Sequence, residues 1–230
     1  MRVVIAIPFH GVFGLFYTVL AVLLLPFFMT SFVEILKSAG LSTIAALLVG
    51  GAISLLSLAT SPINVVIYTT KRRIYTPVVD YVVVFGMPIP IPRIATREEK
   101  SHVAINVGGA LLPAAVATYL LPHAPKPAVF FSIAIASTLV WMVSRVVPGV
   151  GVVTPAVIPP VVAVLAALPA GGGPIATYIT AVYGTIIGAD LLNLRKVLRD
   201  KPPFVSIGGA GVFDGIFLSG MLAATLSMLF

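Results

Sequence analysis

The stretch that decides the fold is YGTIIGADLLNLRKVLRDKPPFVSIGGAGVFDGIFLSG, residues 183–220. An apolar segment that ends near Asp190 is followed by a short basic turn, and a glycine-rich sequence then leads into a second apolar segment that carries Asp214. A carboxylate inside an apolar membrane span costs several kcal/mol unless it is paired, protonated or turned towards a polar cavity. Two such acids on consecutive segments therefore indicate a functional pair.

The composition of the whole chain indicates a membrane protein. Of its 230 residues, 59% are hydrophobic and 9% are charged, and the mean hydropathy is +1.13. These values lie far from those of soluble globular proteins. We therefore expect a single integral membrane domain over residues 1–230, located in the lipid bilayer of the cell membrane and built as an all-α, polytopic helical bundle.

The residues that are missing or scattered limit the chemistry. Cysteine is absent, which excludes disulfides, thiolate nucleophiles and cysteine metal sites. No HExxH motif or paired-histidine spacing occurs, so we predict no metal ion and no cofactor. The net charge of +7 is spread over the turns between apolar runs, which argues against a nucleic-acid partner. Glutamine is also absent and asparagine occurs three times, a composition typical of a thermophilic source.

Seven apolar segments are long enough to cross a bilayer. We place them at about residues 11–32, 41–68, 103–121, 128–147, 148–169, 175–194 and 208–230. Glu34 and Lys37 are expected in the turn after the first segment. The prolines of VPGVGVVTPAVIPP, residues 147–160, predict that the fifth segment begins with a bent or unwound stretch.

The loop over residues 71–101 is predicted to hold a short extended or hairpin-like segment on the membrane surface. Residues 77–85 are rich in Val and Tyr, and GMPIPIPR follows them; β-branched residues interrupted by Gly and Pro favour this conformation. The sequence REEK at 97–100 is expected to be a solvated entry into the third helix.

The distribution of Lys and Arg predicts the orientation in the membrane. With the N-terminus in the cytoplasm, twelve of the 14 basic residues lie on the inner side, and only Lys37 and Lys126 lie outside. Cytoplasmic loops are enriched in Lys and Arg, so we expect a cytoplasmic N-terminus.

This orientation places Asp190 and Asp214 at similar depths, roughly 6–8 Å below the cytoplasmic end of their spans at 1.5 Å per residue. Gly208, Gly209, Gly211 and Gly215 surround Asp214 in sequence and allow close approach of backbone or substrate. Two carboxylates in a low-dielectric site tend to share one proton, the state in which an aspartyl pair activates water. The alternative is that each acid makes a structural hydrogen bond or binds an ion.

The three asparagines, Asn64, Asn106 and Asn193, lie near the predicted cytoplasmic boundary. We expect them to hydrogen-bond neighbouring helices or to cap helix ends, and Asn193 is also a candidate for lining the site. A faint internal repeat relates NVGGA at 106–110 to SIGGA at 206–210, an arrangement that some transporters have.

Several motifs resemble a known family. PINVV at 62–66, NVGGALLP at 106–113, VPGVGVVTPAVIPP at 147–160, GTIIGADLLNL at 184–194 and SIGGAGVFDGIFLSG at 206–220 are similar to the membrane-protein family catalogued as domain of unknown function number 1614. The family name implies no activity.

A second, more distant resemblance carries a function. GAGVFDGIF at 209–217 is similar to the G-x-G-D motif of presenilin and signal-peptide-peptidase type intramembrane proteases, which implies that Asp214 and Asp190 are catalytic. Pro155, in Pro-Ala-Val, resembles the Pro-Ala-Leu motif of those enzymes. The sequence departs from their pattern in two places: Val212 and Phe213 separate Gly211 from Asp214, and Ala189 precedes Asp190.

The function predicted from these observations is an intramembrane aspartyl-protease-like hydrolase that cleaves membrane-spanning peptides near the cytoplasmic face. Two alternatives use the same residues differently. A small transporter or proton- or ion-coupled carrier would use the carboxylates as a relay, and a non-catalytic membrane scaffold would use them for structure. The oligomeric state is left open.

Overall fold

The computed structural model of the chain describes residues 2–5, 12–85, 87–148, 151–199, 202–209 and 215–229. In chain order the elements are β1 (Arg2–Ile5), α1 (Val12–Ser38), α2 (Thr43–Thr60), β2 (Ile63–Val84), β3 (Met87–Asn106), η1 (Val107–Leu111), α3 (Leu112–Leu120), η2 (Leu121–His123), α4 (Lys126–Val143), β4 (Arg145–Val147), β5 (Gly151–Val153), α5 (Ile158–Ala167), η3 (Leu168–Ala170), α6 (Pro174–Thr185), η4 (Ile186–Leu191), α7 (Leu192–Arg199), β6 (Phe204–Ile207), α8 (Gly215–Leu226) and η5 (Ser227–Leu229).

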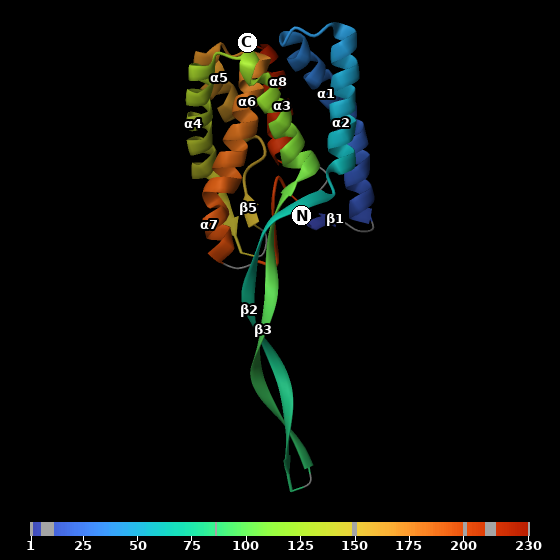
Figure 1. Ribbon diagram of the computed structural model, residues 1–230, viewed down its shortest axis with the longest axis vertical. Coiled ribbons are helices and arrows are strands. Elements are labelled where there is room, and N and C mark those ends of the chain that lie inside the picture. Colours follow the sequence, from blue (N-terminus) through green and yellow to red (C-terminus); the bar gives the residue numbers. More distant parts are fainter. Residues whose placement is uncertain are drawn as a thin grey trace.

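The helices stand side by side in one body (Figure 1). Within the described residues, each of the seven predicted spans contains one continuous helix. Three of these helices are α1, α2 and α4. The other four are each built from adjoining helical elements and run over 107–123, 158–170, 174–199 and 215–229. Three of these helices, Thr43–Thr60, Lys126–Val143 and Pro174–Arg199, are long and apolar enough to cross a membrane. Three more helices are apolar but shorter: Val107–His123, Ile158–Ala170 and Gly215–Leu229.

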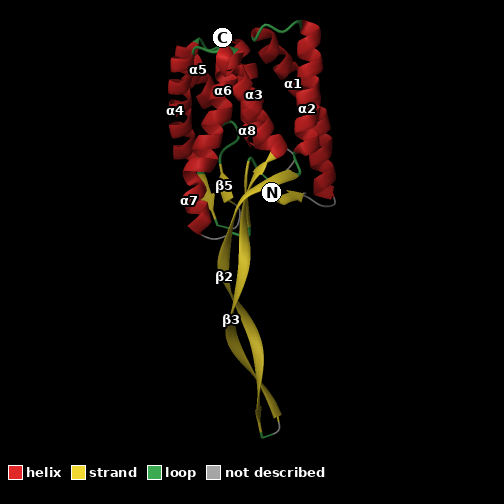
Figure 2. Ribbon diagram, in the orientation of Figure 1, coloured by secondary structure: helices red, strands yellow, loops and turns green. Residues whose placement is uncertain are grey.

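The expectation of an all-α fold is wrong, because a four-stranded sheet leaves one end of the helical body. Its strand order is β1-β2-β3-β6. Strands β2 and β3 pair antiparallel along their whole length and form a long two-stranded ribbon that projects away from the helices (Figure 2). Strand β6 pairs with β3 in parallel, with Ile105 opposite Ile207.

The ribbon corrects three boundaries. The hairpin expected at 77–92 is present, but it extends over Ile63–Asn106 and projects away from the helices (Figure 1). The second helix therefore ends at Thr60, not near residue 68, and the third begins at Val107, not at 103. REEK at 97–100 lies in β3 and is not a helix entry.

Cross-strand charges explain part of the register of the ribbon. In this charged segment, Arg72 lies opposite Glu99 and Arg73 lies opposite Glu98, while Lys71 lies opposite Lys100. The Arg72 Nη2 atom lies 2.6 Å from Glu99 Oε2, and Lys71 Nζ lies 3.6 Å from Glu98 Oε2. Opposite charges across an antiparallel pair stabilise that register over its neighbours. Valine, isoleucine and tyrosine on either side of this segment favour extended backbone.

The centre of the helical body holds an aromatic cluster from α1, α6 and α8. The rings of Phe28 and Phe217 meet edge to face at 4.9 Å, and Phe32 lies 6.0 Å from the ring of Tyr178. Tyr178 is fully buried and its hydroxyl donates to the carbonyl of Pro113 at 3.3 Å. Buried aromatic side chains of this kind contribute large apolar areas to a core, so these three helices form its centre.

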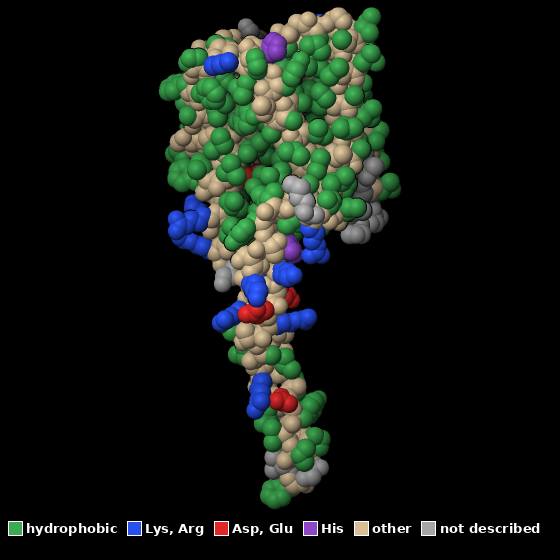
Figure 3. All heavy atoms as spheres, in the orientation of Figure 1, with side chains coloured by type: hydrophobic (Ala, Val, Ile, Leu, Met, Phe, Trp, Pro, Cys, Tyr) green, Lys and Arg blue, Asp and Glu red, His purple; other side chains and the backbone are tan. Residues whose placement is uncertain are grey.

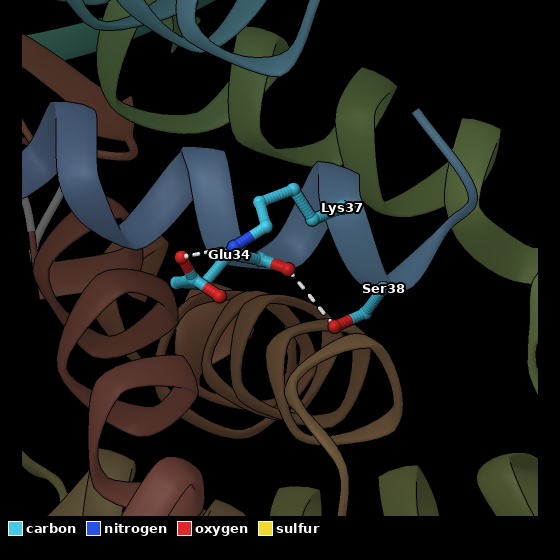
Figure 4. A network of polar contacts seen from close by, with 3 residues as sticks. All are labelled: Glu34, Lys37 and Ser38. Atoms are coloured by element: carbon cyan, nitrogen blue, oxygen red, sulfur yellow. Dashed lines mark hydrogen bonds and ion pairs between the residues drawn. The ribbon is translucent and has the colours of Figure 1, made fainter. Parts of the chain in front are cut away.

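Helix α1 continues beyond its expected end and includes Glu34 and Lys37, which were predicted to lie in a turn. Lys37 Nζ pairs with Glu34 Oε1 at 3.0 Å, and the Ser38 hydroxyl donates to the Glu34 carbonyl (Figure 4). Gly40, at φ +92°, then ends the helix. The amides of Gly40 and Leu41 donate to the carbonyls of Lys37 and Leu36, which is the Schellman arrangement.

The unwound start of the fifth helix is confirmed. Strands β4 and β5 form a small antiparallel sheet in which Arg145 pairs with Val153, and helix α5 begins only at Ile158. Prolines in this segment cannot donate backbone hydrogen bonds, so the regular helix starts where Pro159 and Pro160 occupy its first turn.

Charged side chains gather on the ribbon and at the end of the helical body from which it leaves (Figure 3). The ribbon carries Lys71, Arg72, Arg73, Arg93, Arg97 and Lys100, and β4 and α7 carry Arg145, Arg195, Lys196 and Arg199 at that same end. Lys37 and Lys126 are adjacent to the turns at the opposite end, between α1 and α2 and between α3 and α4.

Candidate functional site

The site begins with the helix that carries Asp190. Residues 174–199 form one helix, and most residues of α6 are buried. Gly184 and Gly188 allow it to pack closely on α4: a Cβ at Gly184 would lie 2.8 Å from the Cβ of Ala136, and one at Gly188 would overlap the carbonyl oxygen of Ser137. Glycine at these two positions is therefore required by helix packing.

Asp190 lies in η4, a π-helical turn in the middle of this helix. Such turns carry one extra residue and are frequent at functional sites. The turn is flanked by α4, β5 and β6. Asp190 is half-buried, and its Oδ2 accepts a hydrogen bond from the backbone N–H of Gly208 at 3.3 Å. The fold thus brings the end of β6 against the acid.

Gly208 and Gly209 form the turn after β6. Their φ angles are +85° and +74°, in the left-handed region that favours glycine. A Cβ at Gly208 would also overlap the Cβ of Ala110 in η1 and lie 2.9 Å from its backbone nitrogen. Gly208 is therefore fixed by conformation and by close packing, and this geometry directs its amide towards Asp190.

The partner acid, Asp214, lies outside the residues that the structure describes, as does Gly211. The pairing of Asp190 with Asp214 therefore stays a prediction. Gly215, the first residue of α8, is exposed, and a Cβ built there has no heavy atom within 4 Å. In sequence, α8 begins six residues after Gly209, and Gly209 follows the residue whose amide contacts Asp190.

Asn193 is buried and hydrogen-bonds within its own helix. Its Nδ2 atom donates to the carbonyls of Gly188 and Ala189 at 3.2 and 3.0 Å, which lie in the π turn. Pro155, another predicted site residue, is exposed in the loop between β5 and α5, and its carbonyl accepts the amide of Ile158 at 3.0 Å. The structure brings Asn193 to the turn that holds Asp190 and gives Pro155 a role in the helix entry.

The base of the ribbon is fastened by a buried polar network that the sequence did not reveal as a unit. Asn106 Nδ2 donates to the Ser61 carbonyl at 2.6 Å and to Asn64 Oδ1 at 3.2 Å, while its Oδ1 accepts the amide of Gly109 at 2.7 Å and so caps η1. This confirms the capping predicted for Asn106. Ser206 joins the network from β6, since its Oγ lies 2.6 Å from Asn64 Oδ1.

Ser206 also reaches the glycine turn, because its Oγ lies 2.5 Å from the Gly209 carbonyl. A hydroxyl has one proton and two acceptors compete for it here. The network therefore connects the two asparagines of the ribbon base to the turn whose amide holds Asp190.

A family model described as "Protein of unknown function (DUF1614)" matches residues 58–226. The chain belongs to the DUF1614 family. The matched region contains the whole ribbon, the polar network and the helix of Asp190. No curated protein matches this DUF1614 member, and no solved structure does. The family description assigns no activity.

In the described part of this DUF1614 protein, no group of three or more His, Asp or Glu side chains is close enough to hold a metal ion. His102 instead lies 3.0 Å from the hydroxyl of Thr69 across the ribbon. The chemistry available at the described site is that of a carboxylate held by a backbone amide within an apolar helix.

One signal in the sequence could have identified the polar network. Asn64, Asn106 and Ser206 each stand at the junction between an apolar run and a glycine- or proline-containing turn. Small polar residues at such junctions are frequent helix caps. Their meeting, however, depends on the parallel pairing of β3 with β6, which no local pattern specifies.

Proposed function

We propose that this DUF1614 member is a multi-pass protein of the cell membrane, with a cytoplasmic N-terminus, that acts as an intramembrane aspartyl-protease-like hydrolase. Asp190 and Asp214 are the proposed catalytic pair, and the proposed substrate is a membrane-spanning peptide. The activity needs no metal ion or cofactor in this proposal.

The observation that carries the proposal is the position of Asp190. It is a half-buried carboxylate in the apolar helix 174–199, at a π turn, and it accepts the Gly208 amide. Burial of an acid in an apolar helix is costly and marks functional positions. The segment that follows Gly208 leads directly to Asp214, so the local chain supports a meeting of the two acids.

The proposed chemistry follows from two acids that share one proton. The ionised carboxylate takes a proton from a water molecule, whose oxygen attacks the peptide carbonyl. The protonated carboxyl gives its proton to the leaving amine. In this proposal one carboxyl of the pair acts as the base and the other as the acid at the start of the reaction.

The segregation of charge supports the proposed membrane orientation. Most of the basic residues lie at one end of the helical body, on the ribbon, β4 and α7. Lys37 and Lys126 lie next to the turns at the other end. The positive-inside rule places the ribbon end in the cytoplasm. Asp190 lies near that end, where a substrate helix would be cut.

The test is a cleavage assay with the full chain in vesicles that contain a membrane-spanning substrate. Asp190→Asn and Asp214→Asn should each abolish turnover, because one acid alone cannot both activate water and protonate the amine. Their melting temperatures should stay unchanged or rise slightly, since removal of one charge relieves the shared site. Asp80→Asn is the matched control: Asp80 is exposed on the ribbon and pairs with Arg93 at 3.2 Å.

Full cleavage by either Asp→Asn variant would end the catalytic proposal. Proton or solute flux across the vesicles that disappears in these variants, without cleavage by the original protein, would favour a carrier. A large drop in melting temperature for both variants would favour structural acids.

A second candidate, a non-catalytic membrane scaffold, is favoured by the ribbon. A two-stranded ribbon of 22- and 20-residue strands that stands off from the helices presents binding surface without contributing to the helical core. A scaffold predicts that deletion of residues 77–92 abolishes partner binding and that both Asp→Asn variants retain it.

A further inference from the structure

The open edges of the ribbon can be identified from one hydrogen bond. The His102 amide donates to the Pro203 carbonyl at 3.0 Å, so it points away from β2. Backbone groups of successive strand residues alternate in direction, and the pairing of β3 with β2 is regular from Val103 to Met87. In this range, the backbone nitrogen of every even-numbered residue of β3 therefore points to the edge of the strand that faces away from β2.

Pro88, Pro90 and Pro92 occupy three of these outward positions in β3. Proline has no N–H to donate, so it is tolerated on an edge and prevents another strand from pairing there. The three prolines thus leave the ladder with β2 intact and block the open edge of β3.

The open edge of β2 is blunted as well. The residues opposite the even positions of β3 are the odd-numbered residues of β2, and these also direct their backbone groups outward. Pro77 has no N–H, and the amide of Tyr81 donates to the Asp80 side chain at 3.0 Å. Addition of a partner strand is therefore disfavoured along both edges.

One face of the ribbon, in contrast, is left apolar and exposed. It consists of every second residue from Tyr75 to Val83 and from Pro88 to Thr96, and we name it the apolar ribbon face. It contains no charged residue, and the exposed fractions of Tyr81 and Ile94 are 63% and 74%. The opposite face carries the ion pair of Asp80 with Arg93. This exposed apolar surface is available for contact with a partner.

We propose that the apolar ribbon face binds the same face of a second copy of this chain. Copies inserted in one membrane direct their ribbons the same way, so a two-fold axis parallel to the ribbons brings identical faces together at equal heights. This shared direction rests on the proposed membrane insertion and not on the proposed hydrolysis.

The two-fold axis creates complementary pairs. It places β2 of one copy over β3 of the other, so Tyr81 lies over Pro90 of the second copy and Val79 lies over its Pro92. Bulky side chains on β2 then meet flat proline rings on β3. At the next charged level, Arg73 lies over Glu98 of the second copy, and the same pair recurs on the other side of the axis. The following level, nearer the helices, would set Lys71 over Lys100, so the complementary contact ends at Arg73.

The membrane itself does not suit this face. The ribbon extends from one end of the helical body along the long axis of the molecule (Figure 1), and the 17 residue steps from Val66 to Val83 correspond to about 56 Å at 3.3 Å per residue. The apolar ribbon face is therefore held away from the surface in which the helices would be embedded.

The size of the contact determines how it must be measured. Nine residues along two strands cover roughly 27 by 10 Å, or about 270 Å² per copy, against about 800 Å² per partner for a stable interface in solution. The contact alone is weak, and the shared membrane raises the effective concentration of the two copies. Association is expected in vesicles and is weaker in dilute detergent.

The test uses the absence of cysteine from the chain. Two differently tagged copies, one with Tyr81→Cys and one with Pro90→Cys, are brought together in vesicles and treated with a bis-maleimide that spans about 10 Å, the spacing of packed sheets. The matched control joins Val82→Cys with Ile89→Cys, the adjacent pair on the opposite face, with exposed fractions of 39% and 45%. We expect several-fold more cross-linked dimer from the first pair.

A second measurement guards against misfolding of the cysteine variants. Tyr81→Arg should raise the monomer fraction counted by single-molecule photobleaching in vesicles, and Val82→Arg should leave it unchanged, with both melting as the original chain does. Equal cross-linking of the two cysteine pairs would overturn the proposal. So would cross-links to a different protein only, or labelling of the Tyr81→Cys thiol by a lipid-phase reagent.

Discussion

Gly208→Ala tests the turn that holds Asp190. The residue has a φ of +85°, and a Cβ there would overlap the Cβ of Ala110 and lie 2.9 Å from its backbone nitrogen. Two separate penalties therefore act on an alanine at this position, one conformational and one steric. Both also displace the amide that donates to Asp190.

The magnitude follows from the two terms. A non-glycine residue in the left-handed region costs about 1–2 kcal/mol, and overpacking of a tight contact costs about 1–3 kcal/mol. We expect the free energy of unfolding to fall by about 2–5 kcal/mol. For a chain of this length, 1 kcal/mol corresponds to roughly 2–4 °C in melting temperature, which gives a drop of roughly 4–20 °C.

The assay is a thermal melt of the full chain in detergent, with Gly215→Ala as the matched control. Gly215 begins α8, and a Cβ there meets no heavy atom within 4 Å, so the change should be neutral or stabilise by up to about 1 kcal/mol. The double variant Gly208→Ala with Ala110→Gly removes the overlap of the two Cβ atoms and should recover part of the loss.

A Gly208→Ala protein that melts within 1–2 °C of the original would refute the described turn. Equal losses from Gly208→Ala and Gly215→Ala would show that glycine content, and not this contact, sets the effect. Lack of any rescue by Ala110→Gly, measured against the cost of Ala110→Gly alone, would contradict the part of the penalty assigned to the overlap of the two Cβ atoms.

Three further predictions test the described contacts. Asn106→Ala removes a helix cap and two buried hydrogen bonds and should cost about 2–4 kcal/mol by thermal melt. Glu99→Gln weakens the 2.6 Å contact to Arg72 and should speed amide exchange in the ribbon, whereas Glu98→Gln, with longer and more exposed contacts, should change it little. Asn193→Ala removes two buried side-chain hydrogen bonds to carbonyls of the π turn and should cost about 1–2 kcal/mol, with faster exchange localised to residues 186–195.

The helices of this protein could be predicted because long apolar runs have few alternatives. Each expected span contains a helix, and the proline-rich start of the fifth is unwound as expected. The boundaries near the ribbon were wrong for a physical reason. Residues 61–68 and 103–106 are mostly apolar and adjoin apolar helices, and hydropathy averaged over a window does not separate a buried strand end from a helix end.

Two signals for the ribbon were present in the sequence. Prolines at 88, 90 and 92 recur at every second residue, the spacing of one strand edge. Arg72 and Arg73 are complementary to Glu99 and Glu98 when the chain between them folds back antiparallel. Read together, these patterns specify a hairpin centred near residue 86, whereas the four residues of REEK read alone suggested a solvated helix entry.

The candidate site could be predicted only in its residue types. Asp190 was identified because an acid in an apolar segment is rare, and the structure places it beside Gly208. The network of Asn64, Asn106 and Ser206 depends on β6 pairing with β3 across about 100 residues of chain. Such pairing has a high cost in loop closure and leaves no local periodicity, so sequence patterns do not reveal it.

The likeness between NVGGA and SIGGA also has a geometric cause. Strands β3 and β6 run in parallel, side by side, and each leads from the sheet towards a helix. A Cβ at Gly108 would overlap the carbonyl oxygen of Ser57, and one at Gly208 would overlap the side chain of Ala110. Both glycines are thus required where a strand end meets a packed backbone. The two backbones differ, since Gly108 lies in η1 and Gly208 has a φ of +85°. Close packing at two neighbouring strand ends is sufficient to select glycine at both positions, so the repeated pattern does not require a repeated transporter fold.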